Sequence, residues 1–252
     1  MSNREIITSP KNPKVLLWRS LKDTRGRRET GCFLVEGFKA VEEALASGFP
    51  CEALLAQTGA DVSLPAGLPV TEVSDRVMEA VCDTRTPQGV AAVMRMRSAP
   101  VTGRRLVALD GVQDPGNVGT ILRTADAAGL DGALLSRACA DPYSPKVLRA
   151  TMGSVFHLPF EVVDDLPAAL AARRDEGMDI LSSQLDGSPF RAYRPSERGY
   201  VLVIGSEGSG VTDEVRALAT HRLRLPMRGR AESLNAAVAA GIMMYQLTEE
   251  TD

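Results

Sequence analysis

Polar side chains follow closely on apolar runs at several points where they could take part in chemistry. They are Asn117, Arg123, Glu207, Ser233 and Asn235. This set of amides, a hydroxyl, a carboxylate and a guanidinium contains neither a Ser/His/Asp nor a Cys/His arrangement, and no cluster of metal ligands. Such side chains bind and orient a ligand through hydrogen bonds and charge more readily than they hydrolyse one. We therefore expect a site that positions its substrate without a metal ion.

Most of these residues also have a plain structural interpretation. Asn117 lies near the start of an expected helix, where asparagine is a good N-cap, and Ser233 could be the N-cap of the last helix. Asn235 lies just inside that apolar helix, where an amide either caps the helix or holds something. Arg123 lies among apolar neighbours and either extends to solvent or reaches an anion. Taken singly, the segments leave both interpretations open.

A glycine-rich segment follows one of the apolar runs. Gly205, Gly208 and Gly210 form the pattern G-x-x-G-x-G. This differs from the G-x-G-x-x-G of dinucleotide-binding loops, and no lysine follows as it does in a phosphate-binding P-loop. Glu207 lies within the segment and is a poor neighbour for a phosphate. The segment is therefore better suited to a ribose hydroxyl or to an arginine.

The composition is that of a globular protein. The chain has 252 residues, of which 44% are hydrophobic and 24% charged, enough for one large domain or two small ones. No apolar run approaches the roughly 18 residues that span a membrane, and the N-terminus lacks the apolar core of a signal peptide. We therefore expect a cytoplasmic protein without membrane segments. The cysteines form no CxxC pair, which favours small buried hydrophobes over a disulfide framework or a zinc site.

Charge is distributed unevenly along the chain. The net charge of the whole chain is −3, but residues 1–39 contain nine Lys or Arg and four Asp or Glu. That segment has a net charge of +5, which leaves −8 for the rest. A basic segment on an acidic body could bind phosphate groups, and it could equally be a solvated surface.

The first part of the chain predicts a small α/β unit. Its strands are expected at residues 32–37, 52–57, 70–73 and 89–96. Helices are expected after Asn12-Pro13 to residue 23, at 38–47 and at 74–82, with a basic loop at residues 24–31. Residues 97–105 mix Pro, Gly and charge and indicate a linker. We therefore expect domains at residues 1–97 and 105–252.

The second part alternates strands and helices more strictly. Strands are expected at residues 106–112, 132–136, 160–163, 179–183, 200–206 and 222–227. Helices are expected at residues 118–128, 145–156, 166–176, 213–219 and 234–248. This alternation predicts a mostly parallel sheet covered on both faces. Ligands of such sheets bind outside the carboxyl ends of the strands.

Taken together and in this order, three segments resemble the motifs of the SpoU (TrmH-like) family of SPOUT RNA methyltransferases. They are Asp114-Pro115-Gly116-Asn117-Val118-Gly119 with Arg123, then Ile204-Gly205-Ser206-Glu207-Gly208, then Leu225-Pro226-Met227 with Ser233-Leu234-Asn235. The resemblance covers about residues 106–247. The first hundred residues are similar, less specifically, to the family's small RNA-binding domain of ribosomal-protein L30e type, through SPKNPKV and FLVEGFKAVEEAL.

The resemblance implies a fold, a cofactor and a reaction. The fold is an α/β methyltransferase domain of SPOUT type whose C-terminal segment is threaded into a trefoil knot, preceded by the L30e-like domain. The cofactor is S-adenosylmethionine and the active unit is a homodimer. The reaction is 2′-O-methylation of a ribose in structured RNA, with ribosomal RNA favoured over transfer RNA. Methylation of a base and RNA binding without catalysis are the alternatives.

The resemblance also assigns roles to residues. Arg123 matches the family's essential arginine, which suits stabilisation of a developing alkoxide or contact with a phosphate better than it suits proton removal. Asn117, Glu207, Ser233 and Asn235 match residues that position the target ribose and the arginine. The cofactor-binding residues implied by position are Ile204, Gly205, Leu225, Met227 and Leu234.

Overall fold

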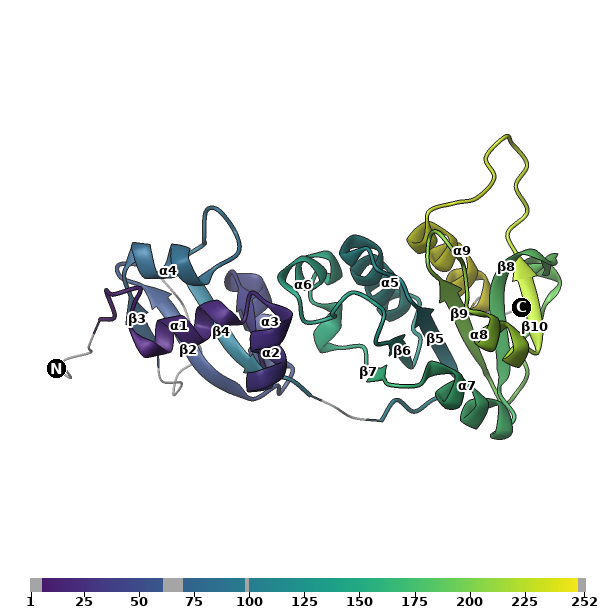
Figure 1. Cartoon of the computed structure of the whole chain (residues 1–252), viewed down its shortest axis with the longest axis horizontal. Coiled ribbons are helices and arrows are strands. Elements are labelled where there is room, and N and C mark those ends of the chain that lie inside the picture. The colour runs from purple at the N-terminus through teal and green to yellow at the C-terminus, as the bar shows by residue number, and fades with distance from the viewer. Residues whose placement is uncertain (1–5, 61–69, 98–99, 249–252) are drawn as a thin grey trace. The chain divides into compact units, whose positions relative to one another are not determined.

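The chain forms two compact units. The computed structural model describes residues 6–60, 70–97 and 100–248. One unit comprises Met1–Arg97 together with Tyr143–Phe156, and the other comprises Ser98–Pro142 and His157–Asp252. Figure 1 shows the elements of both units. In the described ranges, no helix is both long enough and apolar enough to cross a membrane.

The first unit contains a four-stranded sheet in the order β1-β4-β2-β3. Its strands are β1 (Cys32–Glu36), β2 (Cys51–Gln57), β3 (Val70–Val73) and β4 (Val90–Arg95). The strand β4 is antiparallel to both β1 and β2, and β3 runs parallel to β2. Its helices are α1 (Pro13–Ser20), α2 (Thr24–Thr30), α3 (Phe38–Ala46) and α4 (Asp75–Val81), and α6 (Pro145–Thr151) joins them from later in the chain.

The expected basic loop at residues 24–31 is wrong, because Thr24–Thr30 form α2 and Gly31 is its C-cap. The guanidinium of Arg27 is buried and donates to the carbonyls of Leu21 and Lys22, at 2.8 Å each. Gly26 allows the helix to pass close to α1, since a Cβ there would lie 2.1 Å from the carbonyl oxygen of Ser20. The helix therefore depends on contacts with the end of α1, which the local sequence does not reveal.

The segment Tyr143–Phe156 contributes aromatic side chains to the first unit. The ring centroid of Phe33 lies 4.5 Å from that of Tyr143 and 6.4 Å from that of Phe156. The Tyr143 hydroxyl donates to the carbonyl of Arg97 at 3.1 Å. The helix expected at residues 145–156 is shorter and ends at Thr151, because Met152 and Gly153 take positive φ of 50° and 98°; a 3₁₀ turn, Ser154–Phe156, follows.

The second unit is built on a six-stranded sheet in the order β10-β8-β9-β5-β6-β7. Its strands are β5 (Arg105–Asp110), β6 (Gly132–Ser136), β7 (Phe160–Val163), β8 (Asp179–Pro189), β9 (Tyr200–Gly205) and β10 (His221–Arg224). Every neighbouring pair is parallel. The expected parallel α/β sheet is thus confirmed.

Helices cover both faces of this sheet. On one face, α7 (Leu166–Asp175) and α8 (Asp213–Leu218) form a core with Leu106 and Ala108 of β5 and with alternate residues of β6, β8 and β9. Since side chains alternate along a strand, Val107 and Leu109, also fully buried, face the opposite side. There α5 (Pro115–Ala127) and α9 (Ala236–Thr248) pack against each other. Burial on both faces explains the nearly continuous apolar runs of the central strands.

The edge strand β10 and its neighbour β8 differ from their expected lengths. β8 continues beyond the expected Ser183 to Pro189, and β10 ends at Arg224 instead of at Met227. The last pairs of the ladder join Leu223 to Ser188 and Arg224 to Pro189, so β10 stops where its partner stops. The residues after Arg224 therefore leave the sheet as a long segment that leads to α9 (Figure 1).

The four cysteines are free, as expected for small buried hydrophobes. Cys32 and Cys82 are buried, and Cys51 and Cys139 are partly buried. Burial raises the pKa of all four thiols, that of Cys82 to about 12. Because the thiolate is the reactive form, these residues are poor nucleophiles near neutral pH.

Candidate active site

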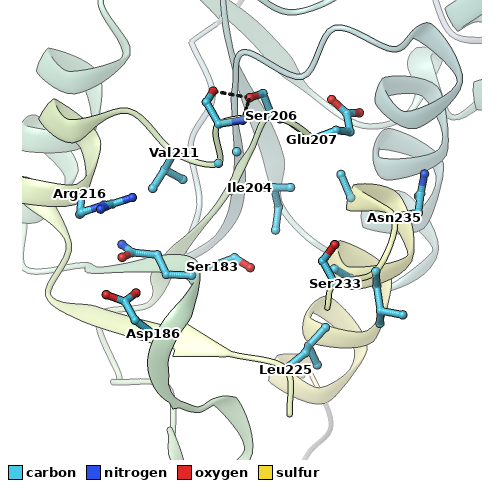
Figure 2. A pocket seen from close by; sticks show the side chains of 18 of the residues that line it. Ser183, Asp186, Ile204, Ser206, Glu207, Val211, Arg216, Leu225, Ser233 and Asn235 are labelled. Atoms are coloured by element: carbon cyan, nitrogen blue, oxygen red, sulfur yellow. Dashed lines mark hydrogen bonds between the residues drawn. The ribbon is translucent and has the colours of Figure 1, made fainter. Parts of the chain in front are cut away.

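A cavity of about 660 Å³ opens at the carboxyl ends of β8, β9 and β10. The ladder between β8 and β9 ends at the pair Ser182–Val203, and the cavity begins with the next residues, Ser183 and Ile204. Figure 2 shows Ile204 near the centre, with Glu207, Asn235, Ser233 and Leu225 on one side and Arg216 and Asp186 on the other. The cavity thus lies where ligands of parallel α/β sheets bind.

The residues expected to hold a cofactor all line this cavity. They are Ile204, Gly205, Leu225, Met227 and Leu234. Residues 225–234 belong to no helix or strand, and their backbone groups form no hydrogen bond with the described part of the chain. This wall of the cavity therefore offers apolar side chains together with free backbone donors and acceptors.

The glycine-rich segment after β9 is a tight loop. The backbones of Ser206 and Gly210 exchange two hydrogen bonds of 3.0 Å. A Cβ at Gly205 would lie 2.1 Å from the carbonyl carbon of Gly210, so only glycine fits. The loop exit is held by Asp110 at the end of β5, whose buried carboxylate accepts from the N–H of Thr212 at 2.7 Å. The loop is thus rigidly connected to two central strands.

Three predicted site residues form one chain of hydrogen bonds. The Nδ2 of Asn235 donates to the Oδ1 of Asn117 at 2.9 Å, and the Nδ2 of Asn117 donates to the Oε1 of Glu207 at 2.5 Å. The Oδ1 of Asn235 accepts from the N–H groups of Ala237 and Val238 at the start of α9. Since backbone N–H groups can only donate, they set the orientation of both amides. The second carboxylate oxygen of Glu207 remains available at the cavity.

The helix caps differ from those expected. Asp114, not Asn117, is the N-cap of α5, because its carboxylate accepts from the N–H of Asn117 at 2.8 Å. Asn235, not Ser233, caps α9. Ser233 lines the cavity instead. Helix capping therefore does not account for Asn117 or Ser233, whereas Asn235 both caps α9 and donates a hydrogen bond to Asn117.

Close packing of α5 and α9 brings Asn117 and Asn235 together. A Cβ at Gly241 of α9 would lie 3.4 Å from the methyl group of Thr124 on α5. Thr124 lies two helical turns after Asn117 and so on the same face of α5. The two helices are therefore close neighbours at this point, and the amides meet at one end of their contact.

Arg123 is placed apart from this cluster. It lies on α5, is exposed, and is not among the residues that line the cavity. Within the described residues it forms no hydrogen bond or ion pair. In a single copy of the chain, Arg123 is therefore not joined to Asn117, Glu207 and Asn235.

The cavity also includes polar residues that sequence reasoning did not single out. These are Ser183, Gln184 and Asp186 of β8, Ser206 and Ser209 of the glycine-rich loop, and Arg216 of α8. Among the described residues, the Oε1 of Gln184 and the Nε of Arg216 are buried without a hydrogen-bond partner. The missing information was that β8 lies between β9 and β10 in the sheet. This position brings the residues of β8 to the same cavity as the loop after β9 and the segment after β10.

The fold and the cavity define a class of protein. They describe a parallel α/β protein that binds an organic ligand at the strand ends and orients a second group with amides and a carboxylate. The described residues hold no group of three or more His, Cys, Asp or Glu side chains that could bind a metal ion.

Comparison with known proteins identifies the family. Residues 104–245 match the SpoU rRNA Methylase family, and residues 12–92 match the MRM3-like substrate binding domain. The chain belongs to the SpoU rRNA methylase family, which confirms the resemblance seen in the three loops.

Relatives and solved structures match nearly the whole chain. The chain is 40% identical over 245 residues to the 23S rRNA (guanosine(2553)-2′-O)-methyltransferase RlmP of Bacillus subtilis, covering 96% of this chain and 98% of the relative. An AdoMet-bound rRNA methyltransferase from Sinorhizobium meliloti is similar with a TM-score of 0.86 and 35% identity, covering 96% and 97% of the two chains. The AdoMet complex of the SpoU methyltransferase AviRb from Streptomyces viridochromogenes has a TM-score of 0.82 and 27% identity, covering 94% and 97%.

Proposed function

We propose that the protein transfers a methyl group from S-adenosylmethionine to a ribose 2′-hydroxyl of ribosomal RNA. The observation that carries the proposal is the chain of hydrogen bonds from Asn235 through Asn117 to Glu207, which borders the cavity. Membership of the SpoU rRNA methylase family supports the class of reaction. Two similar proteins that match nearly the whole chain have names that specify rRNA, which supports ribosomal over transfer RNA as the substrate.

The cavity fits S-adenosylmethionine in size and in chemistry. Its volume of about 660 Å³ lies in the range of pockets that bind organic cofactors. Ile204, Leu225 and Met227 supply apolar surface, and the backbones of Gly205 and Leu234 supply hydrogen-bonding groups. The unpartnered Gln184 and Arg216 atoms leave an acceptor and a donor for a ligand. When bound, the cofactor supplies a methyl group on a sulfonium, which is a good leaving group.

The protein itself must orient the ribose hydroxyl and accept its proton. The pKa of a ribose hydroxyl is far above 7, so its oxygen must lose the proton as it attacks the methyl carbon. In our proposal, the free carboxylate oxygen of Glu207 accepts a hydrogen bond from that hydroxyl. Asn117 and Asn235 hold the carboxylate in place, and Ser233 adds a hydroxyl beside the ribose. Alignment of the attacking oxygen is then the main contribution to rate.

Arg123 would contribute positive charge. A guanidinium with a pKa above ~12 keeps its proton, so it suits the developing alkoxide or an adjacent phosphate. Because Arg123 is exposed and outside the cavity lining of its own chain, we propose that it acts at the cavity of a second copy.

The surface of α9 supports a homodimer. Val238, Ile242 and Tyr245 are 50%, 43% and 51% exposed, and their spacing of four and three residues places them on one stripe of the helix. The opposite side of α9 is buried through Ala237, Ala240, Met243, Met244 and Leu247. An exposed apolar stripe beside the cavity is the kind of surface that a second copy would cover.

The course of the chain supports a trefoil knot. β10 lies at one edge of the sheet, beyond β8, whereas α9, which follows it, packs on α5, which follows the central strand β5. The C-terminal segment must therefore return from the edge towards the centre of the sheet. We propose that it does so through the loop formed by the preceding elements.

The two domains would have different roles. We propose that residues 1–97 bind the RNA and that residues 105–252 carry out methyl transfer in the cytoplasm. The match of residues 12–92 to a substrate binding domain supports the first role.

Two measurements test the proposed function. Isothermal titration calorimetry should show binding of S-adenosylmethionine, and nucleoside mass spectrometry of 23S rRNA incubated with protein and cofactor should show a 2′-O-methylated nucleoside. A methyl group that stays with the nucleobase after glycosidic cleavage would indicate a base methyltransferase. Modification of transfer RNA alone would show that transfer RNA, not ribosomal RNA, is the substrate. The absence of both cofactor binding and modification would favour a protein that binds RNA without catalysis.

A further inference from the structure

Four arginines without acidic partners lie on β10 and on the segment that connects it to α9. β10 and the segment after it carry Arg222, Arg224, Arg228 and Arg230, and all are exposed. No acidic residue lies between positions 222 and 231, although the chain as a whole has a net charge of −3. Within the described residues, none of these arginines forms an ion pair. This concentration of positive charge is unusual for the acidic part of the chain.

Arg228 and Arg230 lie between two parts of the chain that line the cavity. Met227 and Ser233 on either side of them both line the cavity, whereas residues 228–230, here named the arginine loop, do not. A Cβ at Gly229 would meet no atom within 4 Å, so the arginine loop is open to solvent. Three extended residues span at most about 11 Å, which limits the separation of the Arg230 and Ser233 backbones. The segment is visible in Figure 1 as the long connection between β10 and α9.

Exposed arginines of this kind contribute little to stability, because they form no ion pair within the chain. Their planar guanidinium groups match the geometry of a phosphate, which they can bind with two hydrogen bonds. RNA whose ribose lies beside Glu207, Asn117 and Asn235 carries a phosphate on each side of that ribose. We propose that Arg228 and Arg230 bind the RNA phosphates that flank the target nucleotide, with Arg222 and Arg224 extending the same basic surface. This inference rests on the proposed function.

The test compares two double variants of the full-length protein. Arg228→Gln with Arg230→Gln removes the proposed contacts, and Arg174→Gln with Arg198→Gln removes the same charge at the opposite, amino ends of the strands. Arg174 and Arg198 are exposed and precede the starts of β8 and β9, away from the cavity. Binding of a 23S rRNA transcript is followed by fluorescence anisotropy over a series of KCl concentrations, and cofactor binding by calorimetry.

The arginine-loop variant should bind RNA with a weaker dependence on salt. Loss of two phosphate contacts lowers the slope of log K against log[KCl] by roughly 1.4–1.8. The KM for RNA should rise while kcat at saturating RNA and the affinity for S-adenosylmethionine stay near the wild-type values. Arg228→Lys with Arg230→Lys should restore the slope, because lysine keeps the charge. The control variant should match the wild type.

Other results overturn the inference. An arginine-loop variant with the wild-type slope and KM would show that these residues do not contact the RNA. An equal change in the control variant would show a general effect of net charge. Failure of the wild-type protein to bind the cofactor or to methylate RNA would refute the proposed function instead, so the two failures are distinguishable.

Discussion

Substitution of Asn235 separates its two roles. Its Oδ1 caps α9 by accepting from the N–H groups of Ala237 and Val238, and its Nδ2 holds the amide of Asn117. In Asn235→Asp, a carboxylate oxygen can still cap the helix, but the N–H donor to Asn117 is lost. In Asn235→Ala, both interactions are lost. The two variants should therefore differ in stability and agree in loss of activity.

The expected magnitudes follow from these contacts. Loss of the cap in Asn235→Ala costs about 1 kcal/mol, which lowers Tm by roughly 2–4 °C in a domain of this size. Asn235→Asp keeps the cap and should unfold close to the wild-type temperature. The new carboxylate at position 235 would face the Oδ1 of Asn117, so that two acceptors meet. If the Asn117 amide rotates to donate to this carboxylate, its Oδ1 faces the carboxylate of Glu207 instead. Asn235 and Glu207 are exposed in the free protein, so water can satisfy these groups and the unfolding temperature changes little. A displaced Glu207 that loses its charge-assisted hydrogen bond to the ribose hydroxyl in the transition state raises the barrier by about 1.5–3 kcal/mol, equivalent to a fall in kcat of roughly 10- to 150-fold.

The assay combines thermal unfolding with transfer of a labelled methyl group to 23S rRNA at saturating cofactor and RNA. Asn235→Ser, which can also cap, is the matched control for the charge of aspartate. Two results would show that Asn235 does not have these two roles. One is an Asn235→Asp protein with a kcat equal to that of the wild type. The other is an equal loss of stability in the aspartate and alanine variants, which would show that the cap is not the stabilising interaction.

Four further changes test other parts of the account. In Gly205→Ala the new Cβ would lie 2.1 Å from the backbone of its own loop, so calorimetry should show a loss of cofactor affinity of roughly 100-fold. The control variant Gly229→Ala, whose Cβ would lie in open space, should bind the cofactor normally. Arg123→Ala should bind cofactor with nearly wild-type affinity and lose methyl transfer. Ile242→Glu places a charge on the exposed stripe of α9 and should give a monomer by light scattering, without activity. Burial raises the pKa of Cys82 from 9.0 to about 12, so the folded state keeps the thiol proton at pH values where the unfolded state has lost it. The free energy of unfolding should therefore fall as the pH rises from 9 towards 12, by up to about 1.4 kcal/mol per pH unit from this group. Urea unfolding of Cys82→Ala should show a shallower decline over the same pH range.

Each of these expectations has an opposing result. Normal cofactor binding by Gly205→Ala would place the cofactor elsewhere. Strong transfer by Arg123→Ala would remove its proposed role. An active dimer of Ile242→Glu would exclude the α9 stripe as the interface, and an unchanged alkaline decline in Cys82→Ala would assign that decline to other groups.

The sheet of the second unit was largely predictable from sequence. β6 and β7 have the expected bounds, because each is a short apolar run flanked by turn or polar residues. The edge strand β10 and its neighbour β8 were predicted less well, since their lengths depend on their pairing with each other. Helix α2 was missed because it is stabilised by the buried Arg27, whose partners lie on the preceding helix end.

The candidate site was predictable in part for a similar reason. Amides and a carboxylate at strand ends indicated where chemistry could occur, and the cofactor residues inferred by resemblance gather in one cavity. The direction of each hydrogen bond was not predictable, because it depends on which residue caps α9. Gln184 and Arg216 carried no local signal, since only the order of strands brings them to the cavity.

The most direct test of the central claim is mass spectrometry of nucleosides from 23S rRNA that has been incubated with the protein and S-adenosylmethionine bearing a deuterated methyl group. If the protein methylates ribose, one labelled nucleoside should appear, and its deuterated methyl group should be lost with the ribose on glycosidic cleavage. The same reaction with Asn235→Asp should give far less of it. A label that remains on the base, or RNA without any label, would contradict the claim that the cavity and the Asn235–Asn117–Glu207 chain serve ribose methylation.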